Sequence, residues 1–186
     1  MKKIILFSVI FIFIISTLTF AMKIKGVNLP ETVKIGSTKC YLNGAGIRKK
    51  FFFSIYVIGL YLPVKMSHPS EIINLDKNKG VIMVFTYHKI SPKKIQNAWK
   101  EGFEKNVKDL TALDEKIKKF NSFFNDEVKK GDKFIINYLP DKGTCVYIND
   151  NFKGCIEGKD FMEGLFSIWL GEKPISKGLK KKLLGK

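Results

Sequence analysis

The sequence predicts an α+β protein in which helices cover one face of a long, largely antiparallel sheet. Apolar, β-branched and aromatic runs gather in two groups, residues 31–87 and 133–156, and such runs are typical of strands. Amphipathic helical patterns fall between these groups and after the second one. Because strands do not alternate regularly with crossover helices, separate layers of sheet and helix are favoured over a parallel sheet.

The first 21 residues predict a signal peptide. Lys2 and Lys3 precede an apolar stretch over residues 4–15, and residues 19–21 end in the small side chain that a signal peptidase requires. The apolar stretch is short for a membrane span. We therefore expect one chain of residues 22–186, exported to the periplasm or secreted, with an uncleaved N-terminal anchor as the alternative.

Strand patterns dominate the first part of the exported chain. Residues 31–35 and 39–43 predict two short strands, after which Gly44-Ala45-Gly46 breaks or bulges the chain. Phe51 to Leu62 is rich in aromatic and β-branched residues, which predicts a long strand buried over much of its length. Gly59 within it indicates a bulge or a close approach of another part of the backbone.

Helical patterns follow in the middle of the chain. A short helix over residues 70–75, with Ser70 as N-cap, precedes a buried strand over residues 80–87. Ser91-Pro92 has the N-cap and first-turn proline that start a helix. Two amphipathic stripes should each lie on the sheet: Ile95, Trp99 and Phe103, then Leu113, Ile117, Phe120 and Phe124.

The last third of the chain predicts a β-meander and two helices. Strands are expected over residues 133–139, 144–148 and 152–156. A helix over residues 159–170 should end at Gly171, and a final short helix carries Leu179, Leu183 and Leu184.

Two of the three cysteines flank the last predicted hairpin. A two-residue turn at Asn149-Asp150 would pair position 145 with 154 and leave Cys155 on the other face. A three-residue loop would pair Cys145 with Cys155 and allow a disulfide bond. The Asn-first turn favours the two-residue form, so we expect no bond between them. An odd number of cysteines leaves a free thiol in either case.

The formal net charge of +16 suggests an anionic partner. Anionic membrane lipids are one candidate. Nucleic acid is disfavoured because the lysines are scattered and the known sequence signatures are missing. No His or Cys cluster has metal-ligand spacing, so we expect neither a metal site nor a cofactor.

Arg48 is the single arginine among 33 basic residues. It ends the segment Asn-Gly-Ala-Gly-Ile-Arg, residues 43–48. A guanidinium group can hold a carboxylate through two parallel hydrogen bonds, which an ammonium group cannot do. Arg48 is therefore a candidate anion-binding residue. The alternatives are an internal ion pair or hydrogen bonds to backbone carbonyl groups at the glycine-rich bend.

Two blocks of the sequence resemble the chalcone isomerase-like family in its bacterial, exported form. They are NGAGIRKKFFFSIYVIGLYLP, residues 43–63, and GKDFMEGLFSIWLGEKPIS, residues 158–176, with GDKFIINYLPDKGTCVYIND between them. The resemblance covers nearly all of residues 22–186. It implies an open-faced β-sandwich, in which a curved antiparallel sheet and a layer of helices enclose a ligand cleft.

The resemblance also implies a binding role for Arg48. In the plant enzymes of this family, the matching arginine orients an anionic flavonoid precursor, and further polar groups serve ring closure. By motif position, Tyr56 replaces their threonine, while Ile95, Gly102 and Met162 stand where a tyrosine, an asparagine and a Ser or Thr would be. Isoleucine and methionine donate no hydrogen bond, so isomerase activity is not expected.

We therefore expect a noncatalytic protein that binds a fatty acid or a similar small apolar carboxylate. Arg48 and Tyr56 would bind the carboxylate, in the manner of the family's fatty-acid-binding members, and Phe51, Phe53, Ile55, Val57 and Phe85 could line an apolar tunnel. Tyr87, at the end of a buried strand, is a further candidate for the ligand site. Two alternatives are an intramolecular lyase or isomerase and a protein that interacts with membrane surfaces.

Overall fold

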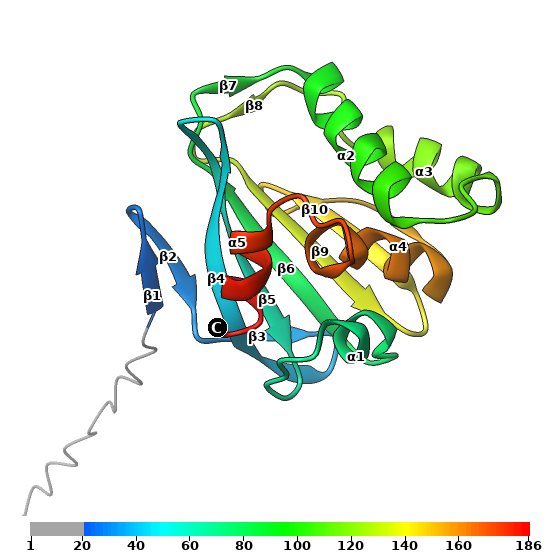
Figure 1. The fold of residues 1–186 in the computed structure, drawn as a ribbon, viewed down its shortest axis with the longest axis horizontal. Helices are drawn as coiled ribbons and strands as arrows, with labels where there is room; N and C mark the ends of the chain where they lie inside the picture. The colour runs from blue at the N-terminus through cyan, green and yellow to red at the C-terminus, as the bar shows by residue number, and fades with distance from the viewer. Residues whose placement is uncertain (1–20) are drawn as a thin grey trace, which may run out of the picture.

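The computed structural model describes residues 21–186 and has the predicted α+β architecture (Figure 1). Its main sheet has seven strands, all antiparallel, in the order β11-β10-β9-β6-β5-β4-β3. The strands are β3 (Thr32–Ile35), β4 (Thr38–Lys50), β5 (Phe53–Leu62), β6 (Lys79–Phe85), β9 (Lys133–Leu139), β10 (Gly143–Ile148) and β11 (Asn151–Ile156).

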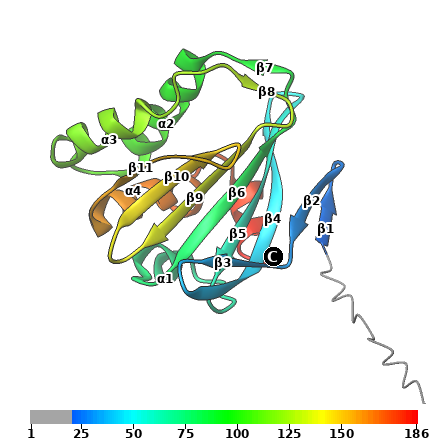
Figure 2. The same ribbon diagram turned by 180° about the vertical axis from the view of Figure 1, so that it is seen from behind.

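The helices lie on one face of this sheet, as predicted (Figures 1 and 2). They are α1 (Pro69–Asn74), α2 (Pro92–Asn106), the 3-10 turn η1 (Thr111–Leu113), α3 (Asp114–Asn121), α4 (Lys159–Leu170) and α5 (Lys177–Leu183). A small pair, β7 (Lys89–Ile90) and β8 (Val128–Lys129), links α2 and the end of the α3 segment to the sheet. The larger core cluster lies between sheet and helices. Within residues 21–186, no helix has both the length and the hydropathy needed to cross a bilayer.

A short hairpin that the sequence pattern did not reveal packs on the other face of the sheet. Strands β1 (Ala21–Ile24) and β2 (Val27–Pro30) form a two-stranded sheet, apart from the main sheet, in the described part of the chain. Leu29 of this hairpin joins Val57 and Tyr61 of β5 in a second core cluster, and the Tyr61 hydroxyl donates to the Pro30 carbonyl at 3.0 Å. The predicted signal peptide lies outside the described residues, except for Ala21, the first residue of β1.

Strand β4 runs through the glycine-rich segment, where a break or bulge was expected. The register shifts between Leu42 and Gly44, and pairing with β5 then continues to Lys50. Helix α5 lies directly on this part of β4. A Cβ atom at Gly44 would overlap the Lys182 carbonyl oxygen, and one at Gly46 would lie 2.8 Å from a methyl group of Leu179. Glycine is thus required because a helix backbone crosses here.

The long aromatic segment does not begin as a strand. Lys50 pairs with Phe53, so Phe51 and Phe52 form the two-residue turn of the β4–β5 hairpin and are exposed. Strand β5 then starts at Phe53 and becomes buried on both faces, by the helices on one side and by the β1–β2 hairpin on the other. The prediction of a strand from Phe51 was wrong because the aromatic run includes the turn itself.

A disulfide bond joins Cys145 and Cys155, which corrects the prediction of two unpaired cysteines. The expected two-residue turn is present, since Ile148 pairs with Asn151. A register shift follows, because Val146 pairs with Gly154 and leaves Lys153 as an additional residue on β11. This bulge brings the two cysteines opposite each other, with Cα atoms 4.0 Å apart. Cys40 is a buried free thiol.

Helix α1 begins one residue earlier than predicted, with His68 rather than Ser70 at the N-cap position. Its C-terminus is held by a buried lysine. The ammonium group of Lys79 donates to the carbonyl oxygens of Ile72 and Ile73 at 2.5 Å and 2.8 Å. These carbonyl groups lie in the last turn of the helix, where backbone donors are few, and the Ile72 carbonyl also accepts from the backbone N–H of Leu75 at 3.4 Å.

Candidate ligand site between sheet and helices

Arg48 and Tyr56 are direct cross-strand partners on β4 and β5. Directly opposed residues of an antiparallel pair project from the same face, and Tyr56 belongs to the core cluster beneath the helices. Next to them the register shifts, because Lys49 pairs with Ser54 and leaves Ile55 as an additional residue. This bulge interrupts the regular pairing, which resumes for two residue pairs before the turn, and it sets Arg48 near the end of the helix-covered face.

The Arg48 side chain is only partly buried. Its Nη1 donates to the carbonyl oxygen of the next residue, Lys49. Among the ion pairs of residues 21–186, none includes Arg48. The guanidinium group therefore keeps donors for an added anion. Of the two alternative roles, the internal ion pair is not found within residues 21–186, and the backbone contact is to Lys49 rather than to the glycine-rich bend.

The Tyr56 hydroxyl lies under helix α4, where it accepts a hydrogen bond from Nε1 of Trp169 at 3.1 Å. Burial raises the pKa of Tyr56 to about 12, although the Trp169 hydrogen bond and the positive charge of Arg48 act in the opposite direction. Tyr56 thus keeps its own proton at neutral pH. Because a phenol can accept one hydrogen bond and donate another, this proton can bind a ligand oxygen.

A row of apolar side chains crosses the sheet from Tyr56. The ring of Phe85 on β6 meets Tyr56 edge to face at 5.6 Å, and Phe134 on β9 meets Phe85 at 4.6 Å between centroids. Ile148 on β10 is the cross-strand partner of Phe134. From Arg48 to Ile148 the row spans the adjacent strands β4, β5, β6, β9 and β10, which is about 19 Å at the usual strand spacing.

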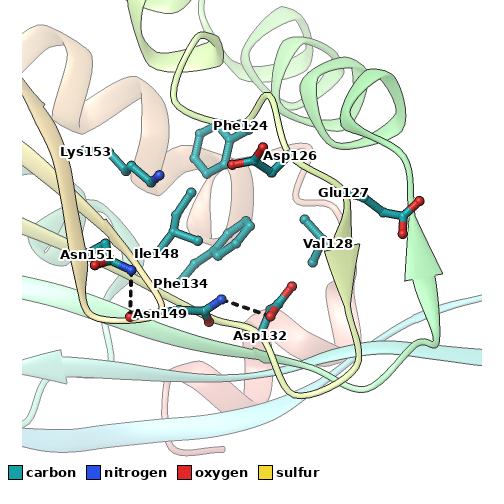
Figure 3. A pocket seen from close by; sticks show the side chains of 10 residues that line it. All are labelled: Phe124, Asp126, Glu127, Val128, Asp132, Phe134, Ile148, Asn149, Asn151 and Lys153. Atoms are coloured by element: carbon teal, nitrogen blue, oxygen red, sulfur yellow. Dashed lines mark hydrogen bonds between the residues drawn. The ribbon is translucent and has the colours of Figure 1, made fainter.

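A pocket of about 160 Å³ lies at the far end of this row (Figure 3). Phe134 and Ile148 line it from the sheet, and Phe124 lines it from the segment after α3 (Figure 3). Its rim is polar, with carboxylates from Asp126, Glu127 and Asp132 and the ammonium group of Lys153 among the lining residues. The apolar lining residues, Phe124, Val128, Phe134 and Ile148, suit a hydrocarbon end, whereas the three carboxylates disfavour a carboxylate ligand.

Aromatic side chains from the helices cover the middle of the row. Trp99 of α2 meets Trp169 of α4 at 5.8 Å and Phe124 at 5.5 Å between centroids, and Phe124 in turn lies on Phe134. The indole N–H of Trp99 is buried and has no hydrogen-bond acceptor within the described chain. A donor in that state is costly, so the packing of this layer is less stable than one in which every polar group is paired.

Tyr87, the third candidate from the sequence, stands apart from the Arg48–Tyr56 pair. It follows β6, packs edge to face on Phe53 at 5.5 Å and lies against His88 at 4.5 Å between centroids. Its backbone N–H donates to the Ile55 carbonyl group, which places it next to the bulge. Tyr87 is therefore a neighbour of the rim, and within residues 21–186 its hydroxyl makes no hydrogen bond to Arg48 or Tyr56.

The structure brings only some of the expected tunnel residues beneath the helices. Phe85 and Ile55 lie in or against the core beneath the helices, but Val57 faces the β1–β2 hairpin and Phe51 and Phe53 are exposed. The apolar surface above and along the row comes instead from four other aromatic residues: Trp99, Trp169, Phe124 and Phe134. The sequence showed these residues as parts of helical stripes and strands, which indicates burial without showing that they meet.

The positions matching the catalytic groups of the plant enzymes are structural here. Ile95 and Met162 are buried in the core. Gly102 lies against Ile168, since a Cβ atom there would be 2.8 Å from its side chain. These positions serve the packing of α2 on α4 and offer no polar side chain to a substrate.

Comparisons with known proteins agree with the fold. A family model described as chalcone isomerase-like matches residues 21–185. Among solved structures, a fatty-acid binding protein of Arabidopsis thaliana is similar, with a TM-score of 0.71 and 17% sequence identity over 86% of this chain and 92% of that chain. No curated protein sequence matches the chain.

Proposed function

The chain belongs to the chalcone isomerase-like family, and from this premise we propose that it is a noncatalytic protein that binds a fatty acid or a similar apolar carboxylate. A noncatalytic binding role is supported at the level of the family, because a structural neighbour is a fatty-acid binding protein. The ligand itself and the residues that hold it are the proposal. Arg48 and Tyr56 bind the carboxylate, and the hydrocarbon chain crosses the sheet toward the pocket.

The observation that carries this proposal is the continuous row from Arg48 to Ile148. One end has a cation and a phenol, the middle has the rings of Phe85 and Phe134, and the other end opens into the pocket. A length of about 19 Å suits an extended long-chain fatty acid better than a compact molecule. Few polar groups at one end of an apolar site are typical of lipid-binding sites.

The helix layer must move to admit such a ligand. The pocket of about 160 Å³ is smaller than the ~300–1,000 Å³ of usual ligand sites, and Trp99, Trp169 and Phe124 fill the space above the row. We propose that α2 and the α3 segment shift away from the sheet when the hydrocarbon chain enters, while α4 stays in place on β10.

The enzymatic alternative is disfavoured by the chemistry of the site. Ring closure requires a polarised ketone and a positioned proton donor network. Ile95, Gly102 and Met162 supply no polar side chain, and the single proton of the Tyr56 hydroxyl does not make a donor network. We further propose that the protein is exported, on the basis of the signal-peptide pattern in residues 1–21.

Intrinsic fluorescence tests the proposal directly, because both tryptophans of the chain, Trp99 and Trp169, lie in the aromatic layer. Delipidated protein is titrated with palmitic acid and, as a matched control, with methyl palmitate. We expect the acid to change the emission and to bind about tenfold or more tightly than the ester, because only the acid carries a charge for Arg48.

Equal binding of acid and ester would contradict carboxylate recognition. Binding of the acid, detected by native mass spectrometry, without any change in tryptophan emission would place the ligand outside the aromatic layer. Loss of chalcone absorbance on incubation with the protein would favour the isomerase alternative instead.

A further inference from the structure

The tip of the β4–β5 hairpin carries three exposed phenylalanines in a row. Phe51 is 85% exposed, Phe52 98% and Phe53 56%. The tip lies at one end of the sheet, beside β7 and β8 (Figure 1). Phe51 and Phe52 are the turn residues themselves, so their side chains contribute little to the core. A cluster of large apolar side chains in water indicates a contact surface for another molecule.

The turn conformation also argues against a structural role for these residues. Phe51 has φ of +53°, a region that glycine, asparagine or aspartate occupy far more readily than a bulky residue. The β10–β11 turn of the same chain shows the usual solution, with Asn149 and Asp150 at φ of +50° and +65°. Both water exposure and backbone conformation therefore disfavour phenylalanine at position 51, which points to a function outside the fold.

Cationic groups surround the phenylalanines. Lys49 and Lys50 precede the turn, and Lys25 reaches it from the β1–β2 hairpin, where its Nζ donates to the Ser54 hydroxyl at 2.9 Å. Lys130 is linked to the tip through two contacts. Phe53 packs on Tyr87, and the backbone N–H of Lys130 donates to the carbonyl group of the next residue, His88. The sequence has no Asp or Glu between Glu31 and Glu71.

This combination fits an anionic lipid bilayer better than a second copy of the chain. Aromatic side chains enter the headgroup region of a bilayer, while nearby lysines bind its phosphate groups. Two copies meeting at their tips would bring their lysines together, which is unfavourable for a chain with a net charge of +16. Glu127, an acidic residue next to β7, forms an ion pair with Lys89 at 2.6 Å, so its carboxylate offsets little of the positive charge of the tip.

We propose that the tip, residues Lys49 to Phe53, docks the protein onto anionic membranes, with Phe51 and Phe52 inserted among the lipid headgroups. Arg48 directly precedes the tip, so docking would bring the rim of the ligand site close to the membrane surface. The docking proposal rests on the exposed tip and its charges, and it stands whether or not the cleft binds a fatty acid.

Co-sedimentation with vesicles tests the docking. The wild-type chain is compared on vesicles of phosphatidylcholine alone and of phosphatidylcholine mixed with phosphatidylglycerol. The main variant is Phe51→Asn with Phe52→Ser, because asparagine accepts the left-handed turn conformation and should preserve the hairpin. A second variant is Lys49→Gln with Lys50→Gln. The control is Phe152→Ser, which removes an exposed ring, 58% accessible, on the edge strand β11.

We expect wild-type protein to bind the anionic vesicles and to lose affinity as salt is added. The phenylalanine variant should bind at least tenfold more weakly, the lysine variant roughly tenfold more weakly, and Phe152→Ser like wild type. Unchanged binding of the phenylalanine variant, or no wild-type binding to anionic vesicles, would overturn the proposal. The proposal would also be overturned if the phenylalanine variant lost self-association, measured by light scattering, but still bound vesicles like wild type. Palmitate binding by the tip variant should stay at the wild-type level, which separates this proposal from the function of the cleft.

Discussion

Tyr56 and Trp169 share a buried hydrogen bond of 3.1 Å that joins the centre of the sheet to helix α4. The bond fixes the phenol opposite Arg48 and leaves its proton available to a ligand. It also attaches Trp169, and with it helix α4, to strand β5. We therefore expect helix movement on ligand entry to involve α2 more than α4. The same contact therefore links the stability of the fold with the orientation of the site.

Tyr56→Phe should lower both the stability of the fold and the affinity for palmitate. The change leaves the Trp169 N–H buried without an acceptor, which costs about 1–3 kcal/mol of unfolding free energy, and removes a hydrogen bond to the carboxylate. We expect palmitate affinity to fall about tenfold. The control is Tyr61→Phe, on the other face of the same strand, where the hydroxyl donates to the Pro30 carbonyl group. Urea denaturation should show a loss of stability in both variants, and a fall in palmitate affinity for both would contradict a specific role for Tyr56.

Gly44→Ala should disturb the contact between β4 and α5. Its Cβ would overlap the Lys182 carbonyl oxygen, and a helix backbone cannot shift as a side chain can. We expect a loss of about 1–3 kcal/mol in unfolding free energy. Gly178→Ala in α5 is the matched control, because a Cβ atom there meets open space and alanine favours a helix. Equal stability of the two variants would show that α5 does not sit closely on β4.

Reduction of the Cys145–Cys155 bond should destabilise the protein. The bond closes a loop with a sequence separation of 10 residues, for which the chain-entropy estimate is about 2–3 kcal/mol. Thermal unfolding with and without a reducing agent measures this difference. The double variant Cys145→Ser, Cys155→Ser should unfold at the same temperature in both conditions. A reductant effect that persists in the double variant would instead have to come from Cys40.

Lys79 should make the stability depend on pH above neutrality. Burial lowers its pKa to about 7, while Glu163 and Asp76 raise it and Lys159 lowers it further. In the unfolded chain the pKa of a lysine is ~10.4, so between the two values the unfolded state binds more protons and stability increases with pH. The contribution should reach about 1.4 kcal/mol per pH unit.

The comparison with Lys79→Met isolates this effect from other titrating groups. Methionine removes the charge and keeps a long apolar side chain, although the carbonyl oxygens of Ile72 and Ile73 lose the hydrogen bonds from Lys79. Urea denaturation of both proteins between pH 7 and 10 should give a steeper increase for wild type. Parallel curves would mean that Lys79 stays charged in the folded protein.

Local signals in the sequence predicted most of the elements, because periodicity and caps act within a few residues. Ser91-Pro92 begins α2 as expected, and Gly171 follows α4. The errors arose where one residue changes the register. The additional Lys153 in β11 brings Cys145 opposite Cys155, and a bulge of that kind leaves no periodic signal.

The candidate site was predictable only as far as its cross-strand pair. The position of Arg48 before an aromatic strand indicated an anion site, and the structure brings Tyr56 opposite it. The partners from other elements could not be foreseen, since Trp169 and Phe134 reach the row only through helix packing and strand order. Phe51 and Phe53 were misassigned because aromatic residues usually indicate burial, whereas here they form an exposed tip.

The most direct measurement of the central claim is the calorimetric affinity for palmitate of the wild type, Arg48→Lys and Arg48→Ala. A lysine keeps the charge but not the paired hydrogen bonds, so its affinity should fall about tenfold, and that of the alanine variant about a hundredfold. Affinity for methyl palmitate should be the same in all three. Equal affinity of the three proteins for palmitate itself would contradict the account and remove Arg48 from the ligand site.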